Sequence, residues 1–248
     1  MGSKCIDRKE ELNQVKQIVV GGSNARVLLI QAGSGWGKSE LLREYRRSLP
    51  SSQPVAIIEF KHAGKDLQHI LFHICEIIGW EKFPNFSKES EKYSTVPNIN
   101  VAHLMMLGSN ELKAEIKGID KTGQSLRRQV LTKAFLKDLR KAGQVIIVID
   151  VFEKCDEEIR NWLIHSFLPT LKTLNNVSVI IAGVQVPEPT LEWEAEKLIL
   201  GGIALKHWTE YLKTEAIDIS DEDLKLMWQS CDGQPLRMLE LITVASAV

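Results

Sequence analysis

Short, continuously apolar runs recur along the chain at the length of buried β-strands. Four are clear, and they span Arg26–Ala32, Pro54–Phe60, Val145–Ile149 and Val177–Ala182. Strands that are hydrophobic at nearly every position are typical of a parallel sheet covered on both faces. A fifth, weaker strand is expected within Leu198–Leu205, where Gly201 and Gly202 interrupt the run.

Between these runs, hydrophobic residues return every three or four positions, which predicts amphipathic helices. The helices are expected over residues 6–20, through Leu41, Leu42 and Tyr45, from Leu67 to Ile78, from Leu126 to Leu139, about Asp156–Phe167, and over most of the chain after Leu205. Residues 81–97 are polar and are predicted to form a loop. Alternating strands and helices predict an α/β fold with a mainly parallel, five-stranded sheet in three layers.

Two segments are predicted to depart from this α/β core. Around Gly108-Ser109-Asn110, apolar and polar residues alternate, which predicts a β-hairpin inserted at about residues 98–118. The helical remainder, about residues 204–248, is predicted to form a lid on a core of residues 1–203. Within it, Ser220 and Pro235 are expected to begin helices.

The composition fits a globular protein and narrows its partners. Of 248 residues, 44% are hydrophobic, which suffices for a buried core. The formal net charge of -1 includes no basic excess, so the sequence carries no clear nucleic-acid signal. No apolar stretch has the length of a membrane helix, and the four scattered cysteines predict neither a zinc site nor a disulfide framework. A cytoplasmic protein with reduced thiols is expected.

The candidate chemistry begins in the loop after the first apolar run. Residues 32–39 (AGSGWGKS) match the phosphate-binding pattern G-x-x-x-x-G-K-[ST], with alanine in the first glycine position. Glycines let backbone N–H groups surround a phosphate, and the following helix adds the positive end of its dipole. Lys38 is expected to reach the β- and γ-phosphates, and Ser39 to bind Mg²⁺. Ala32 is compatible with this role if its backbone keeps an ordinary conformation. The residues expected to contact nucleotide are Gly33, Ser34, Gly35, Trp36, Gly37, Lys38, Ser39 and Glu40.

A second acidic position follows the third apolar run. Val145–Ile149 leads into Asp150, the Walker B form, in which the carboxylate holds Mg²⁺. One strand, Pro54–Phe60, lies between the two motif strands in sequence, an order that suits P-loop ATPases with an extra strand between the motifs. Glu153 has two interpretations that the sequence leaves open: it orients the attacking water, or it favours a helix dipole.

The base of the nucleotide is predicted from a motif that is missing. Asp120–Gly123 fits a GTPase-style D-x-x-G, but it lies in a predicted polar turn rather than after a buried strand. No Asn-Lys-x-Asp guanine motif is present in the chain. ATP is therefore favoured over GTP.

With these motifs placed, the chain resembles the nucleotide-binding domain of STAND ATPases, the NACHT and NB-ARC relatives in the AAA-type class. Arg8 and Glu11 are similar to the family's motif near the adenine, with Asp7 in its glycine position. Residues 131–135, 150–154 and 181–187 resemble a prokaryotic branch, and Gly233-Gln234-Pro235 is similar to the Gly-x-Pro motif of the family's lid. The resemblance covers nearly the whole chain. It implies ATP or ADP with Mg²⁺ as ligands, and Arg8 and Pro235 near the base.

One position departs from that branch. Where its members commonly have an arginine after the fourth strand, this chain has Val184, followed by Gln185. Such an arginine would stabilise the γ-phosphate through its charge. Gln185 is expected to hydrogen-bond a phosphate, but it supplies no charge, so hydrolysis is less strongly predicted than binding.

Two functional hypotheses of different classes follow. The first is an ATP-dependent switch in signalling or antiviral defence, with slow hydrolysis that involves Lys38 and Glu153. The resemblance implies effector or sensor partners and a nucleotide-dependent homo-oligomer for it. The second, motivated by Val184 and by the lack of an acid at Val151, is a non-hydrolysing or degenerate scaffold that acts as a protein-interaction module. A metabolic kinase would need a substrate pocket, and no cluster of charges marks one.

Overall fold

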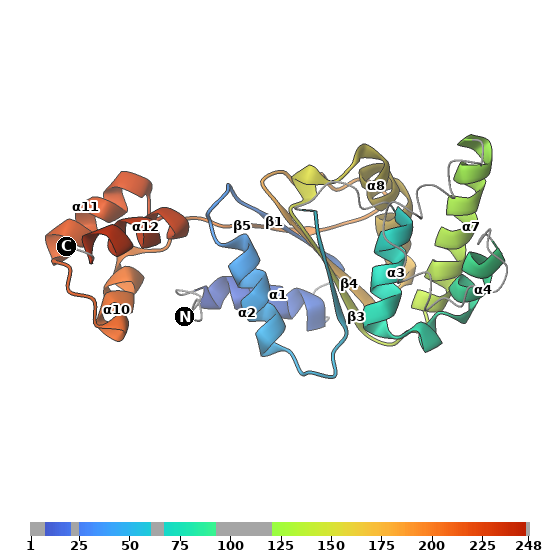
Figure 1. The fold of residues 1–248 in the computed structure, drawn as a ribbon, viewed down its shortest axis with the longest axis horizontal. Coiled ribbons are helices and arrows are strands. Elements are labelled where there is room, and N and C mark those ends of the chain that lie inside the picture. Colours follow the sequence, from blue (N-terminus) through green and yellow to red (C-terminus); the bar gives the residue numbers. More distant parts are fainter. Residues whose placement is uncertain (1–7, 21–24, 61–66, 93–120, 247–248) are drawn as a thin grey trace.

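The core of the protein is a parallel five-stranded sheet (Figure 1). The computed structural model describes residues 8–20, 25–60, 67–92 and 121–246. The strands are β1 (Val27–Gln31), β2 (Val55–Glu59), β3 (Val145–Asp150), β4 (Val177–Gly183) and β5 (Glu196–Ile199). All four pairings in the order β2-β3-β4-β1-β5 are parallel. β4 therefore lies between the two motif strands, β1 and β3, whereas β2, which separates them in sequence, lies at an edge of the sheet.

Helices cover both faces of the sheet. Residues alternate between the two faces along each strand, and both sets are apolar, so each face needs a cover. In β1, Val27 and Leu29 pack in one apolar cluster with α3 (Leu67–Ile78), α7 (Lys121–Leu139) and α8 (Glu157–Trp162). Leu28 and Ile30 face the other cluster, which contains α1 (Lys9–Val20) and α2 (Lys38–Ser48). This arrangement confirms the predicted three-layer α/β fold.

The prediction of a loop over residues 81–97 is wrong for its described part. A short 3-10 turn, η1 (Trp80–Lys82), leads into α4 (Pro84–Lys92). Phe83 and Phe86 are fully buried and pack against Phe135 of α7. The backbone N–H of Phe86 donates to Oδ2 of buried Asp138 at 2.8 Å, which satisfies one of the free amides of the first helical turn. The cap comes from α7, so the local sequence does not reveal it.

The chain between β3 and β5 also differs in detail from the prediction. The helix predicted at about Asp156–Phe167 is α8 followed by a π-helical stretch, η3 (Leu163–Phe167), and the short turns α9 (Leu168–Thr170) and η4 (Leu171–Thr173). β5 ends at Ile199, and Leu205 already begins a helix. β5 is an edge strand in which only Leu198 is buried, so it lacks the continuous apolar run of the others.

Three C-terminal helices form a separate bundle, at the left of Figure 1. They are α10 (Leu205–Glu215), α11 (Asp221–Cys231) and α12 (Pro235–Ala245), and they share their own apolar cluster. Ser220 caps α11 by accepting the N–H of Asp223 at 3.1 Å, and Pro235 opens α12, as predicted. We refer to α10–α12 as the lid.

Two predicted features involve residues without a structural description. The hairpin at about residues 98–118 lies outside the described residues. In the D-x-x-G segment, the part that the structure describes, residues 121–123, belongs to the first turn of α7 rather than to a loop. Among the described residues, no helix is long and apolar enough to span a membrane.

Candidate nucleotide-binding site

The loop between β1 and α2 has the conformation that its glycines permit. Gly35 and Gly37 adopt φ angles of 80° and 88°, in the left-handed region that side chains disfavour. Gly37 is the N-cap residue of α2, so the first free amides of that helix face the loop. Ala32 is not among the residues with positive φ, and its N–H donates to the carbonyl of Gly183 at 3.2 Å. Its ordinary backbone explains why alanine is accepted in the first glycine position.

Lys38 is held at the centre of this loop. Its Nζ donates to the carbonyl oxygens of Ala32 at 2.7 Å and Gly33 at 2.8 Å. Burial lowers the pKa of Lys38 below 10.5, whereas the nearby carboxylates of Glu153 and Asp150 act to raise it. The ammonium group is thus positioned where the loop would surround a phosphate.

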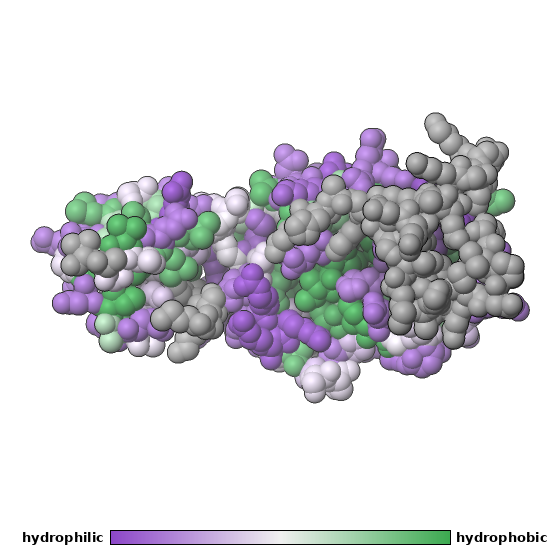
Figure 2. All heavy atoms as spheres, viewed as in Figure 1, coloured by the Kyte–Doolittle hydropathy of each residue, from purple (hydrophilic) through white to green (hydrophobic). Residues whose placement is uncertain are grey.

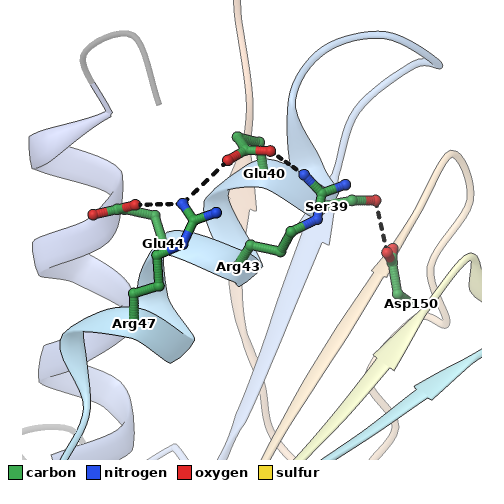
Figure 3. A network of polar contacts seen from close by, with 6 residues as sticks. All are labelled: Ser39, Glu40, Arg43, Glu44, Arg47 and Asp150. Carbon is green, nitrogen blue, oxygen red and sulfur yellow. Dashed lines mark hydrogen bonds and ion pairs between the residues drawn. The ribbon is translucent and has the colours of Figure 1, made fainter. Parts of the chain in front are cut away.

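Ser39 and Asp150 meet at the carboxyl end of β3, as Figure 3 shows. The Ser39 hydroxyl donates to Oδ2 of Asp150 at 2.7 Å, and Oδ1 accepts the N–H of Val151 at 2.9 Å. Asp150 is only 2% exposed. Hydroxyl and carboxylate oxygens are the donors that Mg²⁺ prefers, so this pair fits the ion. No group of three or more His, Cys, Asp or Glu side chains in the described ranges is placed to hold a metal. A cation here would take its other ligands from phosphate and water.

The backbone after Asp150 turns sharply. Val151 has a φ of 61°, a left-handed conformation that is rare for a β-branched residue and is found mostly where surrounding contacts enforce it. The 3-10 turn η2 (Phe152–Lys154) follows. The turn directs Glu153 toward the end of β4, where its Oε2 accepts the N–H of Val184 at 3.0 Å. The same carboxylate lies close enough to oppose the pKa depression of Lys38.

Glu40 joins the site to the exposed face of α2 (Figure 3). Its carboxylate pairs with Arg43 and, at 3.4 Å, with Arg47, which also pairs with Glu44 at 2.9 Å. Figure 2 shows hydrophilic residues gathered over this part of the molecule. Ion pairs this exposed contribute little to stability, so their main effect is to hold Arg43 beside the cavity.

Arg8 reaches the site from the start of α1. Although it is 6% exposed, it has partners for its charge: Nη1 pairs with Glu11 at 2.6 Å, and Nη2 donates to the carbonyls of Trp36 at 3.2 Å and Gly201 at 2.6 Å. It thereby connects the phosphate-binding loop to the segment that leads into the lid. Sequence reasoning selected Arg8 through its resemblance to an adenine-side motif, and the structure places it in the wall of the cavity.

The lid contacts the loop directly through the start of α12. Gln234 Nε2 donates to the carbonyl of Ser34 at 2.8 Å, and the N–H of Leu236 donates to the carbonyl of Gly35 at 3.1 Å. A Cβ added at Gly35 would lie 3.0 Å from Cβ of Leu236. These contacts need a residue without a side chain at position 35. Sequence reasoning selected Pro235 but missed Gln234 and Leu236.

These groups enclose a cavity of about 670 Å³, a size within the range of small-molecule sites. The predicted residues that line it are Arg8, Ser34, Gly35, Gly37, Lys38, Ser39, Glu40, Asp150, Glu153 and Pro235. Gln185 is exposed and is not among the lining residues, and neither are Gly33 and Trp36. The structure adds lining residues that the sequence analysis did not select: Arg43, Val151, Lys154, Val184, Ile203, Leu236 and Leu239.

Comparisons with known proteins agree with this architecture. A family model described as "AAA domain" matches residues 21–188, and no curated protein matches the chain. Among solved structures, a Walker-type ATPase of Pyrococcus abyssi has a TM-score of 0.57 at 14% identity, covering 97% of this chain and 72% of its own. A STAND protein of Pyrococcus horikoshii with a tetratricopeptide repeat sensor has a TM-score of 0.59 at 18% identity, covering 94% of this chain and 28% of its own. Cdc6p of Pyrobaculum aerophilum has a TM-score of 0.57 at 13% identity, and the match covers 96% of this chain and 60% of Cdc6p. At these identities the likeness concerns the fold.

Proposed function

Because the chain belongs to the family of AAA domains, which are P-loop ATPases, we propose that it is the ATP-binding switch module of a STAND-type signalling or defence protein. The observation that carries this proposal is that one cavity is lined both by the phosphate-binding loop and by α12 of the lid. Since Gln234 and Leu236 hydrogen-bond to the backbone of that loop, phosphates bound there would alter the contacts that hold the lid. A switch requires nucleotide to bind two lid positions with different affinity.

The proposal divides the chain into a core of residues 1–203 and a lid of residues 204–248. Ile203 packs in the apolar cluster of the lid, so the hinge would lie just before it, at Gly201 and Gly202. The resemblance to STAND ATPases supports effector or sensor partners and nucleotide-dependent self-association, and the similar protein of Pyrococcus horikoshii carries a tetratricopeptide repeat sensor.

Each predicted residue receives a role in this proposal. The backbone from Gly33 to Glu40 and the N-terminus of α2 would bind the phosphates of ATP or ADP, with Lys38 as the neutralising cation. Ser39 and Asp150 would hold Mg²⁺, which supplies positive charge to the phosphate oxygens. Arg8 and Pro235 would lie on the base side. A role for Gln185 stays a prediction without support from the cavity.

Hydrolysis is proposed to be slow, and one observation favours the alternative of a non-hydrolysing scaffold. Glu153, the predicted water-orienting residue, is already hydrogen-bonded to the N–H of Val184. Val184 itself brings no charge to the cavity. That contact occupies Oε2 of the carboxylate, so the other oxygen, Oε1, would have to orient the water. The two candidates therefore share nucleotide binding and differ in turnover.

The experiment uses the purified chain with Mg-ATP, Mg-ADP and Mg-GTP, with Lys38→Ala as the test variant. Lys141→Ala is the matched control, because Lys141 is exposed near the opposite end of β3. Thermal melting measures binding, since a ligand at a hundred times its Kd stabilises the fold by about 2.7 kcal/mol. Phosphate release measures turnover.

Three outcomes separate the candidates. Stabilisation by ATP with slow phosphate release, both lost in Lys38→Ala and retained in Lys141→Ala, supports the switch ATPase. Retention of ATP through gel filtration without phosphate release supports the scaffold. If no nucleotide shifts the melting temperature of the unaltered chain, both candidates are wrong.

A further inference from the structure

Four cationic side chains line the cavity, and three of them have partners. Arg8 binds Glu11 and two carbonyls, Lys38 binds two carbonyls of the loop, and Arg43 pairs with Glu40. Lys154 differs: within the described part of the chain, its ammonium group makes no hydrogen bond or ion pair. A cation that lines a cavity without a protein partner is available to a ligand.

The turn that carries Lys154 is held in place from several sides. Phe152 is 3% exposed, and the guanidinium of Arg160 lies 5.5 Å above its ring. Arg160 also donates to the carbonyls of Glu153 at 3.4 Å and Cys155 at 3.3 Å, one residue on either side of Lys154. The N–H of Lys154 donates to the carbonyl of Val151 at 3.0 Å. The backbone of Lys154 is thus fixed, and the long side chain alone is free to adjust.

A triphosphate at this end of the cavity would gain from a further cation beside Lys38 and the Mg²⁺ proposed at Ser39 and Asp150. Asp150 and Glu153 place two carboxylates beside Lys38, which is the other lysine in the cavity wall. The terminal phosphate of a triphosphate adds negative charge that a diphosphate lacks, at the end nearest these carboxylates. Like charges in a partly buried site repel strongly, and a lysine close by offsets that repulsion.

We infer that Lys154 contacts the terminal phosphate and makes the site prefer a nucleoside triphosphate over a diphosphate. This inference rests on the proposed function, because it assigns a role in the same cavity. Lys154 is the last residue of the turn η2, which follows Asp150, so its side chain starts beside the residues proposed to bind Mg²⁺ and the phosphates. It would supply the positive charge that an arginine in the position of Val184 brings in the family branch that the chain resembles.

The test compares Lys154→Met with Lys154→Arg and with Lys141→Met as the matched control. Kd values for Mg-ADP and for Mg-AMP-PNP, which is not hydrolysed, are measured by calorimetry on each variant. The readout is the change in the ratio of the two Kd values relative to the unaltered chain. Because Lys154 is exposed, the methionine variant should fold, and its melting temperature without nucleotide checks this. Lys154→Gln, measured in parallel, gives a second neutral variant.

Loss of the charge-assisted contact should weaken AMP-PNP binding about tenfold in both neutral variants. ADP binding should change by less than about twofold, because the diphosphate ends before the contact. Arginine should restore most of the preference, and Lys141→Met should not alter it. An unchanged ratio in the neutral variants, or an equal loss for both nucleotides, overturns the inference while leaving nucleotide binding intact. Failure of the unaltered chain to bind either nucleotide overturns the proposed function instead.

Discussion

Replacing Gly35 with alanine should release α12 from the phosphate-binding loop, whereas the same change at Gly37 should not. The two glycines form a matched pair, because both have left-handed backbones, with φ of 80° and 88°. They differ in what an added Cβ would meet. At Gly35 it would lie 3.0 Å from Cβ of Leu236, whereas at Gly37 the nearest atom, Cγ of Pro235, is 3.9 Å away.

The expected magnitudes separate backbone strain from lid contact. An alanine forced into the left-handed region costs about 1–2 kcal/mol, and this term applies to both variants. In Gly35→Ala the crowding atom Cβ of Leu236 is fixed to the helix backbone, so α12 itself must shift. The shift lengthens and weakens the hydrogen bonds to Ser34 and Gly35, each of which contributes about 0.5–1.5 kcal/mol when fully formed. The unfolding free energy should fall in both variants, and further in Gly35→Ala.

Hydrogen exchange at the start of α12 tests this reasoning without nucleotide. The amide of Leu236 is protected by the carbonyl of Gly35, since the first amides of a helix have no partner within it. Gly35→Ala should speed its exchange about two- to tenfold relative to the unaltered chain, from the hydrogen-bond energy above. Gly37→Ala should leave it unchanged. Equal acceleration in both variants would mean that loop strain, not the lid contact, governs α12, and would refute the argument.

Two further predictions test the core. Burial raises the pKa of Cys155 to about 12, so its thiol stays protonated at neutral pH. A disulfide reagent at pH 8 should leave Cys155 and the similarly buried Cys75 unmodified until guanidinium unfolds the chain, and rapid labelling of either of these two residues in the folded protein would contradict this. Asp138→Ala should lower the unfolding free energy in urea by about 1–3 kcal/mol, because it leaves the N–H of Phe86 without an acceptor in the core. Glu91→Ala, at an exposed position of α4, should change it by less than about 0.5 kcal/mol, and equal effects would refute the capping role.

Features carried by local sequence were predictable, and features made by tertiary contact were not. The phosphate-binding loop and Asp150 could be placed because strand, loop and helix follow one another within a few residues. α4 could not, because its apolar anchors Phe83 and Phe86 are few, and its cap, Asp138, lies on another helix. β5 was misplaced by a few residues because Leu198 is its one buried residue, so no continuous apolar run marks its bounds.

The candidate site shows the same division. Ser39 and Asp150 were paired from their motifs, and the structure brings their oxygens to 2.7 Å. Gln234 and Lys154 were missed, because an exposed glutamine or lysine has no distinctive pattern in sequence. Both become informative only when the fold places them at the cavity. Gln185 was selected for its hydrogen-bonding side chain, but the chain after β4 places Val184, and not Gln185, in the cavity wall.

The peptide at Val184 explains why a switch is a better proposal than a fast catalyst. Its N–H donates to Glu153, in the turn after β3, and its carbonyl accepts from Nε2 of Gln31, the last residue of β1, at 3.2 Å. The segment after β4 is therefore held by groups from both neighbouring strands. Oε1 of Glu153 would orient a water while Oε2 keeps its bond to Val184, so a movement of this carboxylate toward the water would pull on that segment. The chemical step and the connection between strands would then depend on one carboxylate, so hydrolysis would be coupled to the position of the segment after β4. Slow turnover coupled to movement at the strand ends is the behaviour that a switch requires.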